Sequence, residues 1–154
     1  MDSKLSAKNQ RIIIVISEFN EIIIKRLLRG ALKAFLYYDG LEKNIKVFRV
    51  PGAFEIPGTI YQVLQNHKPD AIVALGAVIR GKTPHFDFVA KESAHGISVI
   101  SQNIDIPIIN GILTTDDVEQ ALERSHPNGQ NKGWDAIESA LQTISVYSDI
   151  HAAL

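Results

Sequence analysis

The sequence predicts an α/β sandwich, with helices covering both faces of a parallel sheet, and three observations support this prediction. Short aliphatic runs alternate along the chain with longer segments whose apolar residues recur at helical spacing. The aliphatic runs are continuous rather than alternating with polar residues, which is typical of strands buried on both faces. The chain has 154 residues, a length that suits one domain with a core of its own.

The N-terminal part predicts an arm followed by the first strand and helix. Residues 1–10 lack an amphipathic period and are interpreted as an N-terminal arm, which leaves residues 11–154 as a single domain. Residues 11–16 are almost entirely β-branched and predict a strand. The apolar residues that follow recur at helical spacing, so we expect a helix that Asn20 caps and Gly40 ends.

Two further strand–helix units follow along the chain. Residues 45–50 predict the second strand, and the apolar spacing over about residues 54–66 predicts a helix. Residues 71–79 form the longest aliphatic run and predict the third strand. We expect the next helix to begin around Pro84, which suits a first helical turn, and to run past Glu92.

The last third of the chain completes the pattern. Residues 106–113 predict the fourth strand, and Thr114 with Asp117 resembles a capping box that opens a helix through Arg124. Residues 126–133 are predicted as a polar loop before a final amphipathic helix. The predicted fold is therefore a flavodoxin-like three-layer α/β/α sandwich with a four-stranded parallel central sheet.

Composition excludes several classes of function. The chain has no cysteine, so disulfides, thiolate nucleophiles and cysteine-based metal sites are excluded. Its net charge of −1 lacks the basic surplus of a nucleic-acid-binding protein, and its five histidines show no metal-ligand spacing. No apolar run is long enough for a membrane helix, and the N-terminal residues lack the apolar core of a signal peptide. We expect a cytoplasmic protein that handles a small molecule, with neither nucleic acid nor membrane as partner.

Four segments follow the predicted strands at the edge where parallel α/β folds bind ligands, and we expect these segments to lie near one another. They are residues 17–20, 51–55 and 80–85 and the segment that begins at Thr114. Gly81 through Pro84 would present a helix N-terminus, which favours an anion such as a phosphate monoester. His85 follows in the same turn, where it is suited to proton transfer near neutral pH.

Other positions in these segments have both a structural and a functional interpretation. Phe19 is either a core aromatic or a flat surface on which a ring ligand stacks. Glu55 either complements a helix dipole or accepts hydrogen bonds from a polyhydroxylated ligand. Arg124 and Lys132 flank the polar loop; lone cations there are usually solvated, but together they could hold a phosphate.

Residues 76–83 match the P-loop pattern G-x-x-x-x-G-K-[ST] between a predicted strand and a predicted helix. A phosphate cradle needs a flexible loop, however, and residues 77–79 (AVI) prefer to continue the strand. A flavodoxin-type flavin site is also disfavoured, because Glu18 stands in the turn that would need hydroxyl side chains. The dinucleotide pattern G-x-G-x-x-G is absent from the sequence.

Five motifs stand in one order and at one spacing along the chain. They are Phe19-Asn20, residues 50–57 (VPGAFEIP), residues 76–87 (GAVIRGKTPHFD), residues 110–114 (NGILT), and residues 119–124 followed by 131–133. In this combination, which covers nearly the whole chain from about residue 11, the sequence resembles the lumazine synthase family of riboflavin biosynthesis. The resemblance implies a transferase of the penultimate step that needs no cofactor or metal. It would join 5-amino-6-(D-ribitylamino)uracil to 3,4-dihydroxy-2-butanone 4-phosphate, with loss of phosphate and water.

The resemblance also implies a role for each matching position. His85 would be the catalytic proton-transfer residue, and Phe19 would stack on the pyrimidine ring. The other substrate-binding positions would be Ala53, Phe54, Glu55, Ala77, Val78, Ile79 and Asn110. The phosphate-binding positions would be Lys82, Thr83, Arg124 and Lys132.

The family assembles as homopentamers, and some of its members pack pentamers into a capsid of sixty subunits. Asn110, Arg124 and Lys132 would then serve the site of a neighbouring subunit. Many members carry phenylalanine where this chain has Asn110, so we expect its affinity for ligands to differ. The loop at residues 125–130 lacks the Gly-x-Lys-x-Gly-like pattern frequent in capsid formers, which favours a free pentamer.

Two other functions remain as alternatives to the synthase. One is a non-catalytic carrier that binds a lumazine or flavin on the same fold. The other is a P-loop phosphotransferase, which the residues between the two glycines of the motif disfavour.

Overall fold

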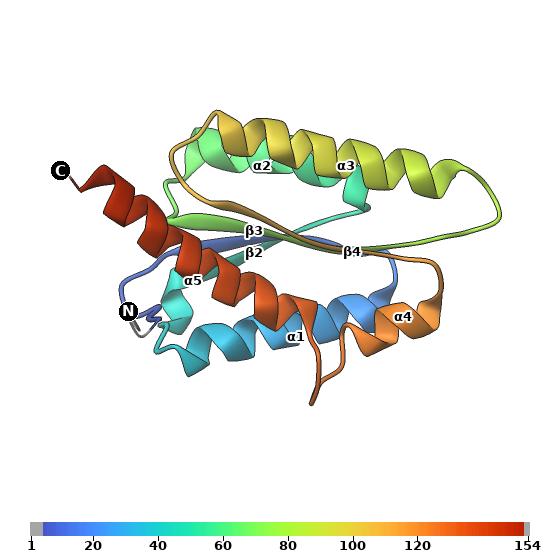
Figure 1. Cartoon of the computed structure of the whole chain (residues 1–154), viewed down its shortest axis with the longest axis horizontal. Coiled ribbons are helices and arrows are strands. Elements are labelled where there is room, and N and C mark those ends of the chain that lie inside the picture. The colour runs from blue at the N-terminus through green and yellow to red at the C-terminus, as the bar shows by residue number, and fades with distance from the viewer. Residues whose placement is uncertain (1–4, 153–154) are drawn as a thin grey trace.

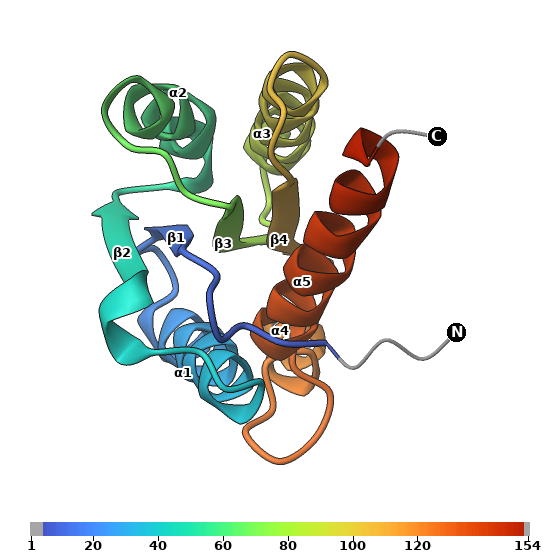
Figure 2. The same cartoon turned by 90° about the vertical axis from the view of Figure 1, so that its left-hand side faces the viewer.

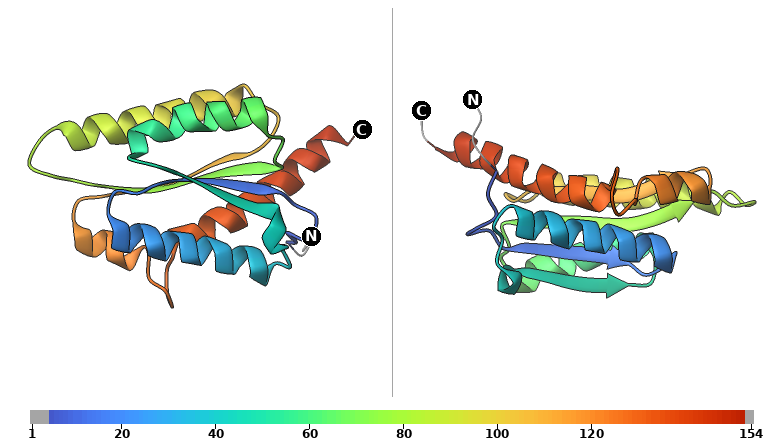
Figure 3. Two further views of the ribbon diagram at one scale, coloured as in Figure 1. Left: turned by 180° about the vertical axis from the view of Figure 1, so that it is seen from behind. Right: turned by 90° about the horizontal axis from the view of Figure 1, so that it is seen from below.

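Four aliphatic segments form the central sheet in the computed structural model, which describes residues 5–152 (Figure 1). The strands are β1 (Ile12–Ser17), β2 (Ile45–Val50), β3 (Ala71–Ile79) and β4 (Ile108–Thr115). Their order is β2-β1-β3-β4, and every pair is parallel. Figure 3 shows the strand arrowheads at one end of the sheet. The predicted four-stranded parallel sheet is confirmed.

Burial of the strands follows their place in the sheet. All of β1 and all but the last residue of β3 are buried, because these central strands have neighbours on both sides and helices on both faces. The edge strand β2 is mixed in exposure. The prediction for the fourth strand was two residues too early: β4 begins only after Pro107, which has no N–H to donate. Its end pairs Thr115 with Ile79.

Helices cover both faces of the sheet. The helices are α1 (Glu21–Tyr37), α2 (Ile56–Asn66), α3 (His85–Gln102), α4 (Val118–Glu123) and α5 (Lys132–His151), with short 3₁₀ turns η1 (Glu42–Asn44) and η2 (Ala53–Glu55). Figure 2 shows α2 and α3 on one face and α1, α4 and α5 on the other. Each face has its own apolar core, so the predicted three-layer sandwich is confirmed. None of the helices in residues 5–152 is long and apolar enough to cross a bilayer.

Three local predictions were wrong in detail. Asn20 precedes α1 as predicted, but its backbone is left-handed (φ 70°) and its side chain does not cap the helix. The strand β4 continues through Thr114, and it is Asp117 whose carboxylate accepts the Gln120 N–H at 2.8 Å and caps α4. The polar loop ends earlier than predicted, because Asn131 caps α5.

The N-terminal segment within the described residues packs against the domain. Ala7 is fully buried, and its N–H donates to the carbonyl oxygen of Tyr38 at 2.7 Å. Leu5 packs at the border of the same core. The rest of the predicted arm, residues 1–4, lies outside the described residues.

Candidate active site

A cavity of about 630 Å³ opens at the carboxyl end of the sheet, between the α2/α3 layer and the strand ends. Its walls come from the turns after β1 and β2, the end of β3 and the start of α3. Among its lining residues are nine of those predicted from the sequence: Phe19, Ala53, Phe54, Glu55, Ala77, Val78, Ile79, Thr83 and His85. Its volume is in the range of small-molecule sites.

The strand order explains why these segments meet. The chain leaves β1 toward one neighbour, β2, while β3 lies on the other side of β1. Parallel α/β sheets bind ligands at such a switch in strand order, past the carboxyl ends of the strands. The segments after β1, β2 and β3 therefore converge as predicted.

Aromatic side chains form the apolar part of the cavity. Phe19 is 72% exposed, so its interpretation as a core residue is wrong. Phe54 and Phe88 are 50% and 56% exposed, and their rings stack with centroids 5.8 Å apart. Exposed aromatic faces in a cavity suit a planar ligand. The sequence reasoning missed Phe88, although its place three residues after His85 on one helix face was a usable signal.

The edge of β3 offers backbone groups to the cavity. The β1–β3 ladder ends at Leu75, whereas the β3–β4 ladder continues to Ile79. Asn20 donates its side-chain N–H to the carbonyl oxygen of Ala77 at 3.3 Å, which ties the first turn to this edge. Beyond that contact, the residues of β3 line the cavity without a β1 partner.

Glu55 has a structural contact and also faces the cavity. Its carboxylate accepts the N–H of Gly52 at 3.0 Å and so closes the turn after β2. The residue is exposed and lines the cavity at the same time. A carboxylate held in this way is available to hydroxyl donors of a ligand.

The segment matching the P-loop pattern does not form a phosphate loop. Its first four residues belong to β3 and pair with β4, as the β-branched residues predicted. Only residues 80–84 leave the strand, and Gly81 and Thr83 line the cavity. Lys82 lies between them but is not among the lining residues. His85 begins α3 at the cavity wall.

Arg80 was not singled out from the sequence, yet it has the densest set of polar contacts at this edge. Its Nε donates to Asp116 Oδ1 at 2.9 Å, and its Nη2 lies 3.6 Å from Asp87 Oδ1. Its guanidinium lies over the Phe86 ring, 4.5 Å from the centroid. The hydrogen bond to Asp116 raises the pKa of Arg80. Because Asp116 is 36 residues away in the chain, sequence spacing carried no signal for this contact.

The fourth predicted segment lies beside the cavity without lining it. Thr115 accepts the backbone N–H of Arg80 at 2.9 Å, so the two turns are neighbours. Thr114 and Asn110 instead line a separate hollow between α3 and β4, of about 460 Å³. The four segments therefore lie near one another as predicted, but the segment after β4 does not line the cavity.

Arg124 and Lys132 meet each other but not the cavity of their own chain. The Lys132 N–H donates to the Arg124 carbonyl oxygen at 2.8 Å, where α4 ends and α5 begins. Neither residue is among those that line the cavity.

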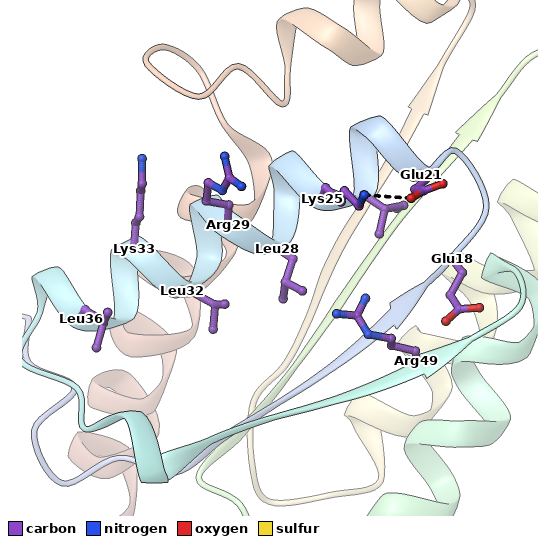
Figure 4. A pocket seen from close by; sticks show the side chains of 10 residues that line it. Glu18, Glu21, Lys25, Leu28, Arg29, Leu32, Lys33, Leu36 and Arg49 are labelled. Atoms are coloured by element: carbon purple, nitrogen blue, oxygen red, sulfur yellow. Dashed lines mark ion pairs between the residues drawn. The ribbon is translucent and has the colours of Figure 1, made fainter.

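A larger groove of about 870 Å³ runs between α1 and the edge strand β2 (Figure 4). Leucines of α1 form its apolar floor, and Arg29, Lys33 and Arg49 stand around it. None of the predicted site residues lines it. Within the described residues, no group of three or more histidine, aspartate or glutamate side chains is arranged to hold a metal ion.

Comparison with known proteins identifies the family. The family model described as 6,7-dimethyl-8-ribityllumazine synthase matches residues 9–148. Curated relatives with that name come from Chloroherpeton thalassium, 43% identical over 97% of each chain, and Nautilia profundicola, 45% identical over 92% of each chain. Another, from Desulfatibacillum aliphaticivorans, is 44% identical over 95% of this chain and 94% of its own. Matches of this length and identity show that the chain belongs to the 6,7-dimethyl-8-ribityllumazine synthase family.

Proposed function

We propose that this chain condenses 5-amino-6-(D-ribitylamino)uracil with 3,4-dihydroxy-2-butanone 4-phosphate to form 6,7-dimethyl-8-ribityllumazine in riboflavin biosynthesis. Family membership supports the reaction. The observation that carries the proposal for the site is the cavity that gathers Phe19, Glu55 and His85 from three separate segments of the chain. An aromatic face, a hydroxyl acceptor and a proton carrier are the groups that this chemistry needs.

The pyrimidine and its ribityl chain would occupy the inner part of the cavity. Phe19 would stack on the ring, and the backbone of residues 77–79 would bind the ring edge where β3 has no β1 partner. The turn formed by Ala53, Phe54 and Glu55 would hold the ribityl hydroxyls, with Glu55 as acceptor.

The phosphate of the second substrate would lie against the start of α3. This helix has 18 residues, and its N-terminus favours an anion through its dipole and unpaired N–H groups. Thr83 and Lys82 stand in the turn just before it. Arg124 and Lys132 would add positive charge from a neighbouring subunit, because their own cavity lies elsewhere.

The chemistry would proceed by imine formation and elimination. The amine of the uracil attacks the ketone to give a carbinolamine, which loses water to become an imine. His85 would transfer protons in these steps, and the phosphate would leave with its charge held by Arg124 and the start of α3. Bringing two substrates together in one cavity contributes much of the remaining acceleration.

We further propose that the chain forms a homopentamer in which each subunit completes the next one's site. The support is geometric: Asn110, Arg124 and Lys132 lie away from the cavity that they would serve. A free pentamer is favoured over a sixty-subunit capsid. Light scattering or sedimentation tests this, since a particle of capsid mass would contradict it. Cytoplasmic location stays a prediction.

The direct test mixes both substrates with the purified protein and follows lumazine absorbance and fluorescence. Turnover supports the synthase. Tight binding of the product without turnover would instead support a non-catalytic carrier.

The phosphate assignment has its own test. Arg124→Ala removes a charge-assisted contact, so we expect the KM for the phosphate substrate to rise about 10- to 100-fold. The KM for the uracil substrate serves as internal control and should change little. If His85→Ala and Arg124→Ala both left rates and affinities unchanged, the assignment of the site would be wrong.

A further inference from the structure

We propose that Arg80 is a positioning residue of this site, which holds the turn of residues 81–84 and the first turn of α3 against the segment that follows β4. The inference rests on the proposed function for its kinetic consequences, but its structural part stands on contacts alone. His85 and Thr83 belong to the segment that Arg80 would hold in place.

The contacts of Arg80 join three parts of the chain. Its backbone N–H donates to Thr115, at the end of β4, at 2.9 Å. Its guanidinium binds Asp116 on one side, and on the other it approaches Asp87 and covers the ring of Phe86. Phe86 and Asp87 directly follow His85 within the first turn of α3. Through its backbone and its side chain together, this one residue links the sheet, the turn after β4 and the helix that carries His85.

The anchor on the β4 side is itself held in place. The Asp116 N–H donates to Gln120 Oε1 at 2.9 Å, and the Thr115 hydroxyl donates to the Asp117 carbonyl oxygen at 2.9 Å. The turn after β3, by contrast, is exposed from Gly81 through Pro84, and a Cβ at Gly81 would meet nothing within 4 Å. Asp116 is thus held by the hydrogen bonds of its own segment, whereas the turn of residues 81–84 has little packing around it. Arg80, which binds Asp116, would therefore be the residue that fixes this turn in place.

Arg80 acts through these neighbours rather than on a ligand. It is not among the residues that line the cavity, whereas Ile79 and Gly81 on either side are. Its side chain is 49% exposed, so its ion pairs contribute little to global stability. Lysine cannot replace it, because a single ammonium cannot bind Asp116, approach Asp87 and stack on Phe86 together.

The first readout needs no substrate. In Arg80→Met, backbone amide hydrogen exchange of residues 81–88 should become faster, with the thermal midpoint unchanged. Lys25→Met is the matched control, because it removes an exposed cation whose ion pair with Glu21 lies on α1. Unchanged exchange in residues 81–88, or faster exchange throughout the domain, would overturn the proposal.

The second readout is kinetic. In Arg80→Met we expect kcat to fall about 10- to 100-fold through misplacement of His85. The KM for the phosphate substrate should rise while that for the uracil substrate stays the same, because Phe19 and the turn after β2 hold the latter. Arg80→Lys should recover only part of kcat. Equal rises in both KM values would indicate general damage and overturn the proposal.

A double variant separates positioning from direct catalysis. If Arg80 acts through Asp116, Asp116→Asn should lower kcat, and Arg80→Met with Asp116→Asn should be no slower than Arg80→Met alone. Additive effects, or an Asp116→Asn variant with normal kcat, would contradict the proposal. If the wild-type protein itself does not turn over, the proposed function fails, and the exchange experiment still decides whether Arg80 holds the turn.

Discussion

The two helix layers of this protein differ in how their helices approach each other. In the layer of α1 and α5, a Cβ at Gly133 would overlap the Leu27 carbonyl oxygen, so the helix backbones are in contact. Asn131 adds to the contact by donating to the Arg26 carbonyl oxygen at 3.2 Å. The other layer also has a close contact, because a Cβ at Gly96 of α3 would lie 2.7 Å from the Pro57 Cβ of α2. At the end where the strands finish, however, Figure 1 shows α3 reaching beyond α2.

The tightly packed contact between α1 and α5 serves stability, whereas the open end of α3 serves ligand binding. Where α1 meets α5, small and polar groups fit closely, and little space is left between the helices. Where α3 extends beyond α2, the rings of Phe54 and Phe88 stay half exposed and border the cavity. We therefore expect substitutions in the first layer to change the free energy of unfolding, and substitutions at the cavity to change turnover.

Gly133→Ala should have the largest effect, because the added methyl group would overlap the backbone of α1. We expect a loss of about 3 kcal/mol in the free energy of unfolding. Urea unfolding at one protein concentration measures it. A loss below about 1 kcal/mol would show that the two helices can separate at low cost, and would remove the contrast between the layers.

His85→Ala should lower turnover rather than the free energy of unfolding. We expect kcat to fall about 100-fold through loss of proton transfer. The free energy of unfolding should stay within about 0.5 kcal/mol, because His85 is exposed at the start of α3. His95→Ala, an exposed histidine further along the same helix, is the control and should keep normal turnover. Equal losses of turnover in both variants would argue against a specific role for His85.

Tyr38→Phe tests the contact between the end of α1 and α5 through the pH dependence of the unfolding free energy. The Tyr38 hydroxyl donates to Glu138 of α5, and this hydrogen bond raises the pKa of Tyr38 from 10.0 to about 12. A raised pKa means that the fold favours the neutral hydroxyl, so its contribution is complete below pH 10 and is lost as the pH rises toward 12.

The variant should lose about 1 kcal/mol of unfolding free energy near neutral pH. The difference between the two proteins should then shrink above pH 10, and urea unfolding at several pH values measures it. A difference that is independent of pH up to 11 would contradict the role of this hydrogen bond.

Gly58→Ala should have the smallest effect, and of opposite sign. Gly58 is exposed in α2, and a Cβ there would meet nothing within 4 Å. Alanine restricts the unfolded chain and favours helix, so we expect a gain of about 0.5 to 1 kcal/mol in unfolding free energy. With Gly133→Ala it forms a matched pair, one glycine in each layer. A loss of stability on this substitution would indicate that α2 is packed more closely than its surroundings suggest.

Prediction from the sequence succeeded where the signal was local. The strands at residues 45–50 and 71–79 have their predicted bounds, because each is an aliphatic run bordered by turn residues. Helix caps were less predictable. Asn20 and Thr114 both have side chains that cap helices well, but contacts with β3 determine what each position does.

The same division holds for the candidate site. The rule for parallel strands, together with the family motifs, identified nine residues that line one cavity. Phe88 and Arg80 were missed, because the importance of each depends on a partner brought near by the fold, Phe54 for one and Asp116 for the other. A sequence motif gives the identity and order of residues in one segment, but it does not predict which side chains from distant segments come into contact.

By itself the sequence determined the fold class, the family and most of the residues around the cavity, because each follows from periodicity or motifs within short segments. Only the tertiary structure decided that Arg80 joins the end of β4 to the start of α3, and that the segment after β4 lies beside the cavity without lining it. The physical reason is the strand order β2-β1-β3-β4. It places the turns after β1, β2 and β3 around one hollow and leaves the turn after β4 beside it.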